Sequence, residues 1–128
     1  MKYYTDKVFK FQKAFGQPVN TSPKENIGKH EGNLRYELLK EENEEYKKAV
    51  AANDLTGVAD ALGDMLYVLC GTINAHGMQD IIKEIFDEIH RSNMTKLRKD
   101  GKPIYRSDGK VLKGKDYSPP DLGKILNK

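Results

Sequence analysis

Five acidic side chains stand in two groups whose spacing suits chemistry on a phosphate. One group is Glu41, Glu42 and Glu45, and the other is Asp60 and Asp64. Residues three or four apart share one side of a helix, so each group presents carboxylates together. Two such helices packed side by side would gather anionic oxygens, which is costly unless a cation neutralises them. Because Mg²⁺ and Mn²⁺ prefer oxygen ligands and often bridge to phosphate, the pattern indicates a Mg²⁺-dependent enzyme acting on a phosphorylated small molecule.

Both groups lie in stretches that predict helices joined by a short link. The first helix runs from about residue 33 to 52, and its apolar stripe turns into glutamates. The second, at about 55–75, follows a capping residue, Asp54, and is apolar on most of its circumference. Such a helix belongs in a core or an interface, where Asp60 and Asp64 would need a partner or a metal. A link of two residues predicts antiparallel neighbours, which brings the two acidic groups together.

The remaining pattern predicts an all-α fold with an irregular tail. A first helix capped by Thr5 should end near Gly16, followed by a long loop over residues 16–32. Another helix is expected at about 80–91, a tight hairpin tip at residues 107–110 and a short helix near 122–126. We therefore expect a four- to five-helix bundle in one domain, residues 1–128. Its helical core would be residues 1–98, and its basic, Gly- and Pro-rich tail residues 99–128.

Composition favours a soluble, cytoplasmic protein. The chain has 128 residues, of which 38% are hydrophobic and 32% are charged, so a partner subunit could complete its small core. No stretch has the length of a membrane span and no secretory signal is evident, so no membrane partner is expected. Cys70, the only cysteine, rules out an intrachain disulfide, fits a reducing compartment and is interpreted as a core residue.

Charge is distributed unevenly along the chain. Residues 31–64 hold nine acids and four bases, a local charge of −5, whereas residues 98–128 hold nine bases and four acids, a local charge of +5. The middle therefore resembles a cation site and the tail an anion site. A nucleic acid adaptor is a second interpretation of the tail, which is disfavoured because the aromatic interleaving of a single-strand platform is missing.

Other polar residues have both a functional and an ordinary interpretation. Asn93 could contact a base or ribose and Lys96 a phosphate, or both could simply end a helix. Lys110 and Lys113 could lie over a phosphate chain, although a solvated hairpin explains them too. The segment around them lacks the spacing of a P-loop. The three glutamates alone could be a solvated helix face, so the metal hypothesis depends on the joint pattern.

The residues resemble a known family. Residues 41–45, EENEE, match the EExxE motif of the all-α nucleotide pyrophosphohydrolases, which include MazG, dimeric dUTPases, dCTP pyrophosphatases and phosphoribosyl-ATP pyrophosphohydrolase. The second family motif is ExxD on the next helix. Asp64 with the apolar residues after it resembles the end of that motif, but Ala61 stands where the Glu is expected. Asp60, four residues before Asp64, is the substitute on the same helix side.

The resemblance covers most of the chain and points to a MazG-like branch close to phosphoribosyl-ATP pyrophosphohydrolase. It extends to residues 11–19 (FQKAFGQPV), 60–64, 92–96 and 108–111. It implies a helical bundle assembled as a homodimer or dimer of dimers, with each site built by helices from two chains. The implied reaction is hydrolysis of a nucleoside triphosphate between its α and β phosphates, giving a monophosphate and pyrophosphate.

The resemblance also implies residue roles. Glu42, Glu45 and Asp64 would bind Mg²⁺ or Mn²⁺ with Asp60 in place of the missing Glu, and Glu41 would be a further ligand or the base that activates water. The expected substrate contacts are Asn93, Lys96, Lys110, Lys113 and Tyr117. Three alternatives stay open: phosphoribosyl-ATP as substrate, a damaged or non-standard nucleotide, and a nucleotide- or metal-binding module that has lost turnover.

Overall fold

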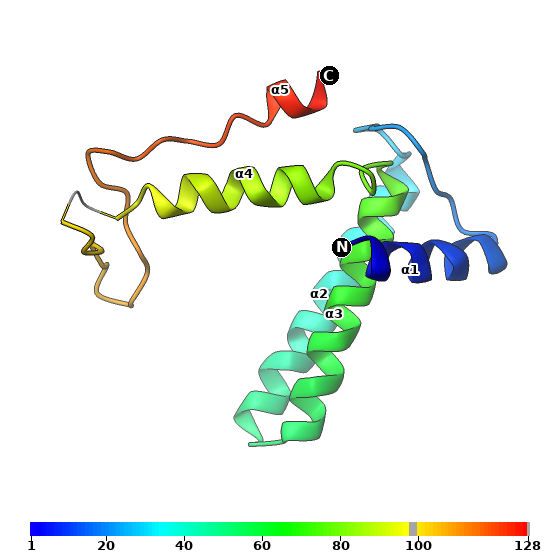
Figure 1. Cartoon of the computed structure of the whole chain (residues 1–128). Helices are drawn as coiled ribbons and strands as arrows, with labels where there is room; N and C mark the ends of the chain where they lie inside the picture. Colours follow the sequence, from blue (N-terminus) through cyan, green and yellow to red (C-terminus); the bar gives the residue numbers. More distant parts are fainter. Residues whose placement is uncertain (98–99, 128) are drawn as a thin grey trace. The chain divides into compact units, whose positions relative to one another are not determined.

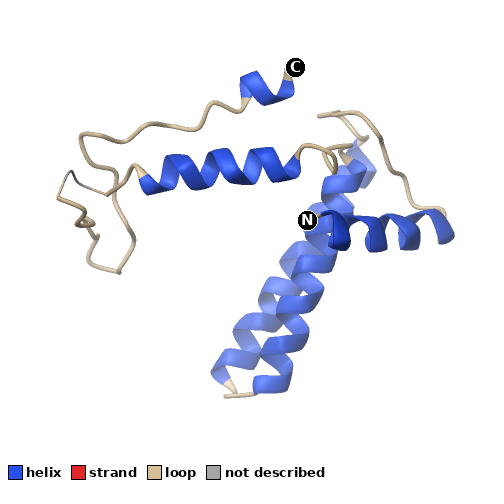
Figure 2. Cartoon of the chain, viewed as in Figure 1, coloured by secondary structure: helices blue, strands red, loops and turns tan. Residues whose placement is uncertain are grey.

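The computed structural model describes residues 1–97 and 100–127, and its elements are helices. They are α1 (Lys2–Ala14), α2 (Lys29–Ala51), α3 (Leu55–Ala75), α4 (Ile82–Met94) and α5 (Gly123–Leu126). Within the described residues there is no strand, only an isolated antiparallel bridge between Tyr105 and Val111 (Figure 2). The all-α prediction is confirmed. The chain divides into two compact units, Met1–Asp80 and Ile81–Lys128, so α4 groups with the segment that follows it.

In the first unit α2 and α3 form a long antiparallel hairpin, and α1 packs across α3 (Figure 1). The link is tight because Asn53 adopts a left-handed conformation (φ 51°) and Asp54 caps α3. The carboxylate Oδ1 of Asp54 accepts a hydrogen bond from the backbone N–H of Gly57 at 3.0 Å. This confirms the predicted cap and the predicted range of α3. The second helix begins earlier than expected, at Lys29 directly after Gly28.

A buried arginine joins α2 to α3. Arg35 donates from Nε to the Thr72 hydroxyl at 3.1 Å and from Nη2 to the Val68 carbonyl at 3.2 Å. Its Nη1 also lies 3.9 Å from Oε1 of Glu31, one turn earlier on α2. Burial lowers the pKa of Arg35 and the Glu31 charge opposes that shift. The guanidinium therefore fixes the spacing of the two helices that carry the acidic groups.

A second buried polar network joins α1 to α3. Gln12 donates to the Gly71 carbonyl at 2.9 Å, and Asn74 donates to the Thr5 carbonyl and to Oε1 of Gln12, both at 3.0 Å. The prediction that Thr5 caps the first helix is wrong. That helix already begins at Lys2, and the buried Thr5 hydroxyl donates to the Met1 carbonyl at 3.3 Å. Thr5 thus lies within α1, where its carbonyl accepts the hydrogen bond from Asn74.

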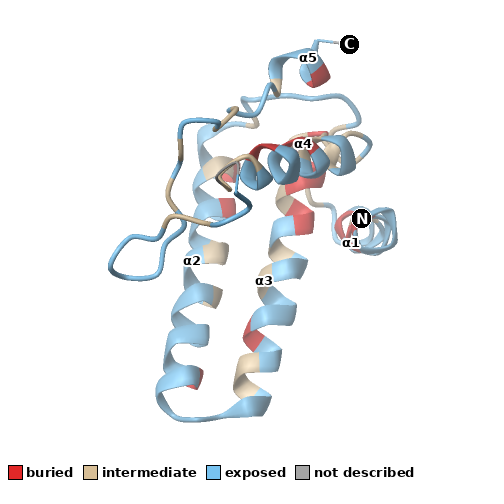
Figure 3. Cartoon of the chain, turned by 60° about the vertical axis from the view of Figure 1, so that its left-hand side comes forward, coloured by how far each residue is buried: buried red, intermediate tan, exposed pale blue. Residues whose placement is uncertain are grey.

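The apolar helix α3 is covered on only part of its circumference. Ala61, Cys70, Ile73 and Ala75 are buried, which confirms Cys70 as a core residue. Much of the α3 ribbon is exposed (Figure 3). Four leucine side chains of α3 stay open in this single chain, namely Leu55 (83% exposed), Leu62 (51%), Leu66 (37%) and Leu69 (44%). We call this set the leucine face. The expected burial of α3 therefore holds for one side of the helix.

The second unit ties the C-terminal segment to α4. Glu88 accepts hydrogen bonds from Nε and Nη2 of Arg91 at 2.7 and 2.9 Å and from the backbone N–H of Asp121 at 2.8 Å. The Thr95 hydroxyl accepts a hydrogen bond from the backbone N–H of Ser118 at 2.8 Å. Side chains of α4 and of its C-cap, Thr95, therefore bind main-chain atoms of residues 118 and 121 and hold the irregular stretch before α5 in position.

The predicted hairpin tip lies in the same unit. The Leu112 N–H donates to the Ile104 carbonyl and the Arg106 N–H to the Lys110 carbonyl, both at 2.7 Å. Gly109 turns with φ 90°, where glycine is favoured. The turn at residues 107–110 is therefore confirmed. None of the helices described is both long and apolar enough to cross a membrane.

Candidate functional site

The glutamates of α2 lie on and beside the line of residues that faces α3. Arg35, Glu42 and Ala49 are seven residues apart, close to two helical turns, and so follow one line along the helix. Arg35 and Ala49 are buried, and Glu42 between them is half-buried. Glu41 and Glu45 flank this line and are exposed. The helix thus presents one glutamate at the seam between α2 and α3 and two beside it.

The aspartates of α3 stand at the rim of the same seam. Asp60 and Asp64 are exposed, so the expectation that they are buried is wrong for the single chain. A residue between them, Ala61, is buried to 2% exposure. Helical spacing places Ala61 about 100° from Asp60, so the side chain at 61 points into the helix contact while the aspartates stay open. We call the five carboxylates Glu41, Glu42, Glu45, Asp60 and Asp64 the acidic seam.

Electrostatics joins the two groups into one site. The pKa of Glu42 is raised above that of an ordinary glutamate, first because partial burial disfavours its charged form. The charges of Asp64, Asp60, Glu45 and Glu41, in that order, raise it further. The four other members of the acidic seam therefore act on Glu42 together, across both helices. The two groups therefore lie close enough for the charges of both to act on Glu42.

The acidic seam offers the carboxylate oxygens that a hard cation prefers, but they are not arranged around a single point. Over the described residues, no group of three or more His, Cys, Asp or Glu side chains is arranged so that it could hold a metal ion. Within the same part of the chain, the five carboxylates have no cationic partner within ion-pair distance. Oxygen donors that repel one another and lack cations are the donor set that Mg²⁺ prefers. Closing them around an ion requires side-chain movement or a second chain.

The other predicted site residues belong to the Ile81–Lys128 unit. Asn93, Lys110 and Lys113 are exposed, and Lys96 is half-buried. Tyr117 is used within its own unit, because its hydroxyl lies 3.4 Å from the Ser92 hydroxyl and Lys113 Nζ lies 4.9 Å from its ring centroid. All five residues lie in the same unit, and their contact with a substrate stays a prediction.

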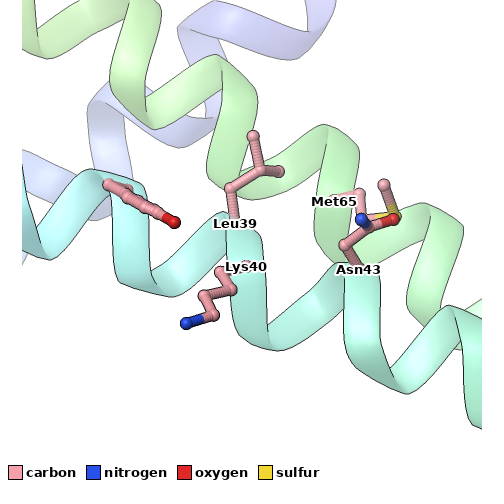
Figure 4. Close-up of a pocket in the computed structure, with 5 residues that line it drawn as sticks. Leu39, Lys40, Asn43 and Met65 are labelled. Atoms are coloured by element: carbon pink, nitrogen blue, oxygen red, sulfur yellow. The ribbon is translucent and has the colours of Figure 1, made fainter.

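Two of the hollows in the Met1–Asp80 unit border α3. One, of about 460 Å³, lies on the α2–α3 hairpin, where Asn43 and Met65 project toward one another from the two helices (Figure 4). Tyr36, Leu39 and Lys40 complete its lining, and no member of the acidic seam contributes. The other hollow, of about 250 Å³, lies between α1 and α3. It is smaller and lined by aromatic and aliphatic side chains together with Lys7.

Sequence reasoning missed the residues that hold the seam in place. The Glu31–Arg35 pair has the i, i+4 spacing of a helical ion pair, which could have been noticed, although its burial could not. Gln12 and Asn74 gave no usable signal, since their hydrogen bond joins residues 62 positions apart. Both networks position α3, the helix that carries Asp60 and Asp64.

An antiparallel pair of helices with acids along its seam defines the class of all-α pyrophosphohydrolase domains. The family model described as phosphoribosyl-ATP pyrophosphohydrolase matches residues 8–93, which span α2, α3 and most of α1 and α4. The chain therefore belongs to the phosphoribosyl-ATP pyrophosphohydrolase family, part of the MazG-like all-α superfamily. The turn at residues 107–110 and the segment around Tyr117 lie outside the match.

One similar protein is the uncharacterized protein L479 of Acanthamoeba polyphaga mimivirus. It is 31% identical over 125 residues, which cover 94% of this chain and 47% of that protein. The chain thus spans about half the length of the curated relative that it matches. The name of that protein gives no activity, so the similarity supports a shared domain. It does not indicate which reaction this chain catalyses.

Proposed function

We propose that this chain is a metal-dependent nucleotide pyrophosphohydrolase. It would cleave a nucleoside triphosphate between the α and β phosphates, so that one water molecule is consumed and a monophosphate and pyrophosphate leave. The observation that carries the proposal is the electrostatic convergence of four carboxylates on Glu42 across α2 and α3. Such repulsion is tolerated where a divalent cation and a polyphosphate complete the charge balance. Family membership supports the same class of reaction.

The acidic seam supplies the metal ligands in this proposal. Glu42, Glu45, Asp60 and Asp64 would hold Mg²⁺ or Mn²⁺, which neutralises phosphate charge and polarises a phosphoryl oxygen when bound. Glu41, exposed beside Glu42, would take the proton of the attacking water as a general base. The oxygen that bridges the α and β phosphates leaves with pyrophosphate.

The second unit supplies the substrate contacts in this proposal. The ammonium groups of Lys96, Lys110 and Lys113 would offset phosphate charge, and the Asn93 amide would donate to a base or ribose oxygen. The Tyr117 hydroxyl, beside Ser92, would donate to a phosphate oxygen. Exposure of Asn93, Lys110 and Lys113 leaves these groups free to reach a ligand.

A second copy of the chain would cover the leucine face. Four leucines at positions 55, 62, 66 and 69 repeat at spacings of seven, four and three, which is the spacing of a helix–helix contact. Burying them would also bring the acids of two chains into one assembly. We expect a dimer that Leu62→Glu converts to monomer, measured by light scattering after gel filtration. Leu126→Glu, a matched change at another exposed leucine (43%), should leave the dimer intact. A wild-type monomer would exclude this assembly.

A phosphoribosyl-ATP-type substrate is the second candidate, and the description of the matching family favours it. It carries the same triphosphate chain chemistry with an additional sugar phosphate on the base. One experiment separates the two. Purified protein is incubated with a panel of nucleoside triphosphates and with phosphoribosyl-ATP, in Mg²⁺, Mn²⁺ or chelator, and products are resolved by chromatography.

We expect metal-dependent release of pyrophosphate with the corresponding monophosphate from at least one member of the panel. Turnover of phosphoribosyl-ATP alone would select the second candidate. No turnover of any member by folded, dimeric protein would contradict the enzyme proposal and favour a binding module.

A further inference from the structure

Arg35 meets α3 at a position where a side chain would block it. The guanidinium donates to the Thr72 hydroxyl and to the Val68 carbonyl. A Cβ added to Gly71, in the same turn of α3, would lie 2.8 Å from Nη2 of Arg35 and 3.4 Å from its Cζ. Arg35 is only 7% exposed, so the guanidinium has little water to move into. Glycine at position 71 therefore leaves the space that the buried guanidinium occupies.

The same glycine also receives α1. Nε2 of Gln12 donates to the Gly71 carbonyl at 2.9 Å, and the added Cβ would lie 3.3 Å from that nitrogen. Glycine inside a helix is less favourable than alanine by about 1 kcal/mol. The close approach of two buried side chains, one from α1 and one from α2, gives a reason for glycine at this point of α3.

Facing positions of α2 and α3 recur in steps of seven residues, close to two turns of each antiparallel helix. The three facing pairs are Arg35 with Gly71, Glu42 with Asp64, and Ala49 with Gly57. At the far pair, a Cβ on Gly57 would lie 3.0 Å from the Cβ of Ala49 and would also meet the Asp54 carboxylate. The middle pair carries two members of the acidic seam, midway between two points where glycine permits close approach.

The two glycine contacts therefore set the helix spacing on both sides of the Glu42–Asp64 pair. The two carboxylates carry like charge, so they do not draw the helices together themselves. Their separation depends instead on contacts two turns away, of which the Arg35 hydrogen bonds are the most buried. Mg²⁺ tolerates little departure from its preferred geometry, so ligands on two helices have to be held at a fixed separation.

We propose that Gly71 and Arg35 are positioning residues for the metal site, because they set the approach of α2 to α3 at which Glu42 and Asp64 bind one cation. This inference rests on the proposed function, in which both carboxylates are metal ligands. Gly71 and Arg35 act through the helices that carry the ligands. A side chain at position 71 would displace the guanidinium or part the helices, and either change would separate the two acids.

The first measurement is the closeness of the two acidic positions without metal. The chain with Glu42→Cys and Asp64→Cys is oxidised by oxidised glutathione in chelator, and disulfide closure is followed by mass spectrometry. Native Cys70 is 1% exposed, so the two introduced thiols react first. Because a disulfide requires close and correctly oriented Cβ atoms, we expect Gly71→Ala to slow closure about fivefold or more. Gly63→Ala, where the Cβ meets nothing within 4 Å, is the matched control and should change the rate less than about twofold.

Either of two results would overturn the proposal. One is an equal rate of closure with and without Gly71→Ala. The other is a pair of cysteines that does not close in the otherwise unchanged chain, because positions 42 and 64 would then not face one another.

The second measurement is Mn²⁺ affinity with the acids intact, taken from the electron paramagnetic resonance signal of the free ion. Gly71→Ala should weaken binding about tenfold, as expected when the support of metal ligands is disturbed. Gly63→Ala should stay within about twofold of wild type. Circular dichroism in chelator verifies that each variant is folded.

Arg35→Lys distinguishes the proposed contact from a general loss of structure. Lysine lacks the Nη2 atom that the new Cβ would meet, and its ammonium still donates hydrogen bonds. Alone, this change should weaken Mn²⁺ binding about threefold, and combined with Gly71→Ala it should bind more tightly than Gly71→Ala alone. A double variant weaker than both single variants would contradict the contact. If Gly71→Ala does not fold, wild-type affinity in Arg35→Lys would overturn the proposal.

Failure of this inference differs from failure of the proposed function. Wild-type protein that binds Mn²⁺ and cleaves a nucleotide, with Gly71→Ala unchanged in both, would keep the enzyme and remove the positioning role. Wild-type protein that binds no Mn²⁺, with disulfide closure still slowed by Gly71→Ala, would remove the metal site and keep Gly71 as the residue that sets the helix approach.

Discussion

The α2–α3 hairpin and the α4–tail unit treat their carboxylates in opposite ways. In the tail unit, Glu88 is paired with Arg91, and Asp87 accepts from Lys83 Nζ at 2.8 Å. In the hairpin, five carboxylates have no cation within ion-pair distance among the residues described, and Glu42 feels the charge of the other four. Paired acids stabilise the structure that they belong to. Unpaired acids whose charges act on one another do not stabilise the chain in this way, and this contrast is the basis of the functional proposal.

The strongest way to break this contrast is to remove one acid from the seam. Glu45→Ala and Asp64→Ala should each lower turnover about a thousandfold, since loss of a metal ligand removes several kcal/mol of transition-state stabilisation. Helicity by circular dichroism should stay close to wild type, because both side chains are exposed. Glu44→Ala, an exposed acid outside the acidic seam, is the matched control and should keep full activity. Near-normal turnover in either seam variant would disprove the ligand assignment.

A second change tests why the family Glu is absent at position 61. Ala61 is 2% exposed, so Ala61→Glu would bury a charge against α2 close to other acids. We expect a loss of about 3–5 kcal/mol in the free energy of unfolding, measured by urea denaturation in chelator. Ala59→Glu, at an exposed position of the same helix, should cost less than about 0.5 kcal/mol. Equal stabilities of the two variants would mean that position 61 does not face α2.

The third prediction concerns buried polar groups that are paired inside the fold, namely the network that joins α1 to α3. Asn74→Ala removes the donor to the Thr5 carbonyl and to Gln12, leaving the buried Oε1 of Gln12 without that partner and the Thr5 carbonyl with its helical one. We expect a loss of about 2 kcal/mol in unfolding free energy, with α1 losing hydrogen-exchange protection before α2. Asn33→Ala, at an exposed position of α2, serves as the control. Uniform loss of protection in α1 and α2 would contradict a local role.

The smallest effect concerns pH and the paired acids of the tail unit. The pKa of Glu88 is lowered to about 2, first by the hydrogen bonds from Arg91 and then by that from the Asp121 N–H. A carboxyl with a lowered folded pKa stabilises the fold above its unfolded pKa and loses this contribution as pH falls. The protection factors of the Tyr117, Ser118 and Asp121 amides, which compare exchange with its intrinsic rate at each pH, should therefore fall between about pH 4.5 and 2. In Glu88→Gln these amides should already be less protected than in wild type at pH 7, and their protection should change less on acidification. A variant whose protection follows the wild-type pH dependence would contradict this role of Glu88.

Much of the fold follows from local signals in the sequence. Helix α3 was predicted over its full range because Asp54 caps it and Gly77, with φ 67°, directly follows its C-cap. The short link, expected to have two residues and found to have three (52–54), made the antiparallel hairpin a geometric consequence. Thr5 was misassigned because its role depends on Asn74, 69 positions away, and no local pattern carries that contact.

The closeness of the two acidic groups could be predicted from the sequence, whereas their exposure could not. Helical spacing correctly grouped the acids of α2 and α3, and the raised pKa of Glu42 shows that the groups interact. The burial expected for Asp60 and Asp64 assumed that an apolar helix is covered on every side. The single chain leaves the leucine face and the aspartates open, because covering them requires surface that the chain itself does not supply.

The central claim is that the acidic seam binds a divalent cation. Its most direct test is Mn²⁺ binding, measured from the electron paramagnetic resonance signal of the free ion. Wild-type protein should bind Mn²⁺ saturably, and Mg²⁺ should compete. Binding should be lost in Glu45→Ala and Asp64→Ala and kept in Glu44→Ala. Equal Mn²⁺ binding by all four proteins would show that the acidic seam is not the metal site.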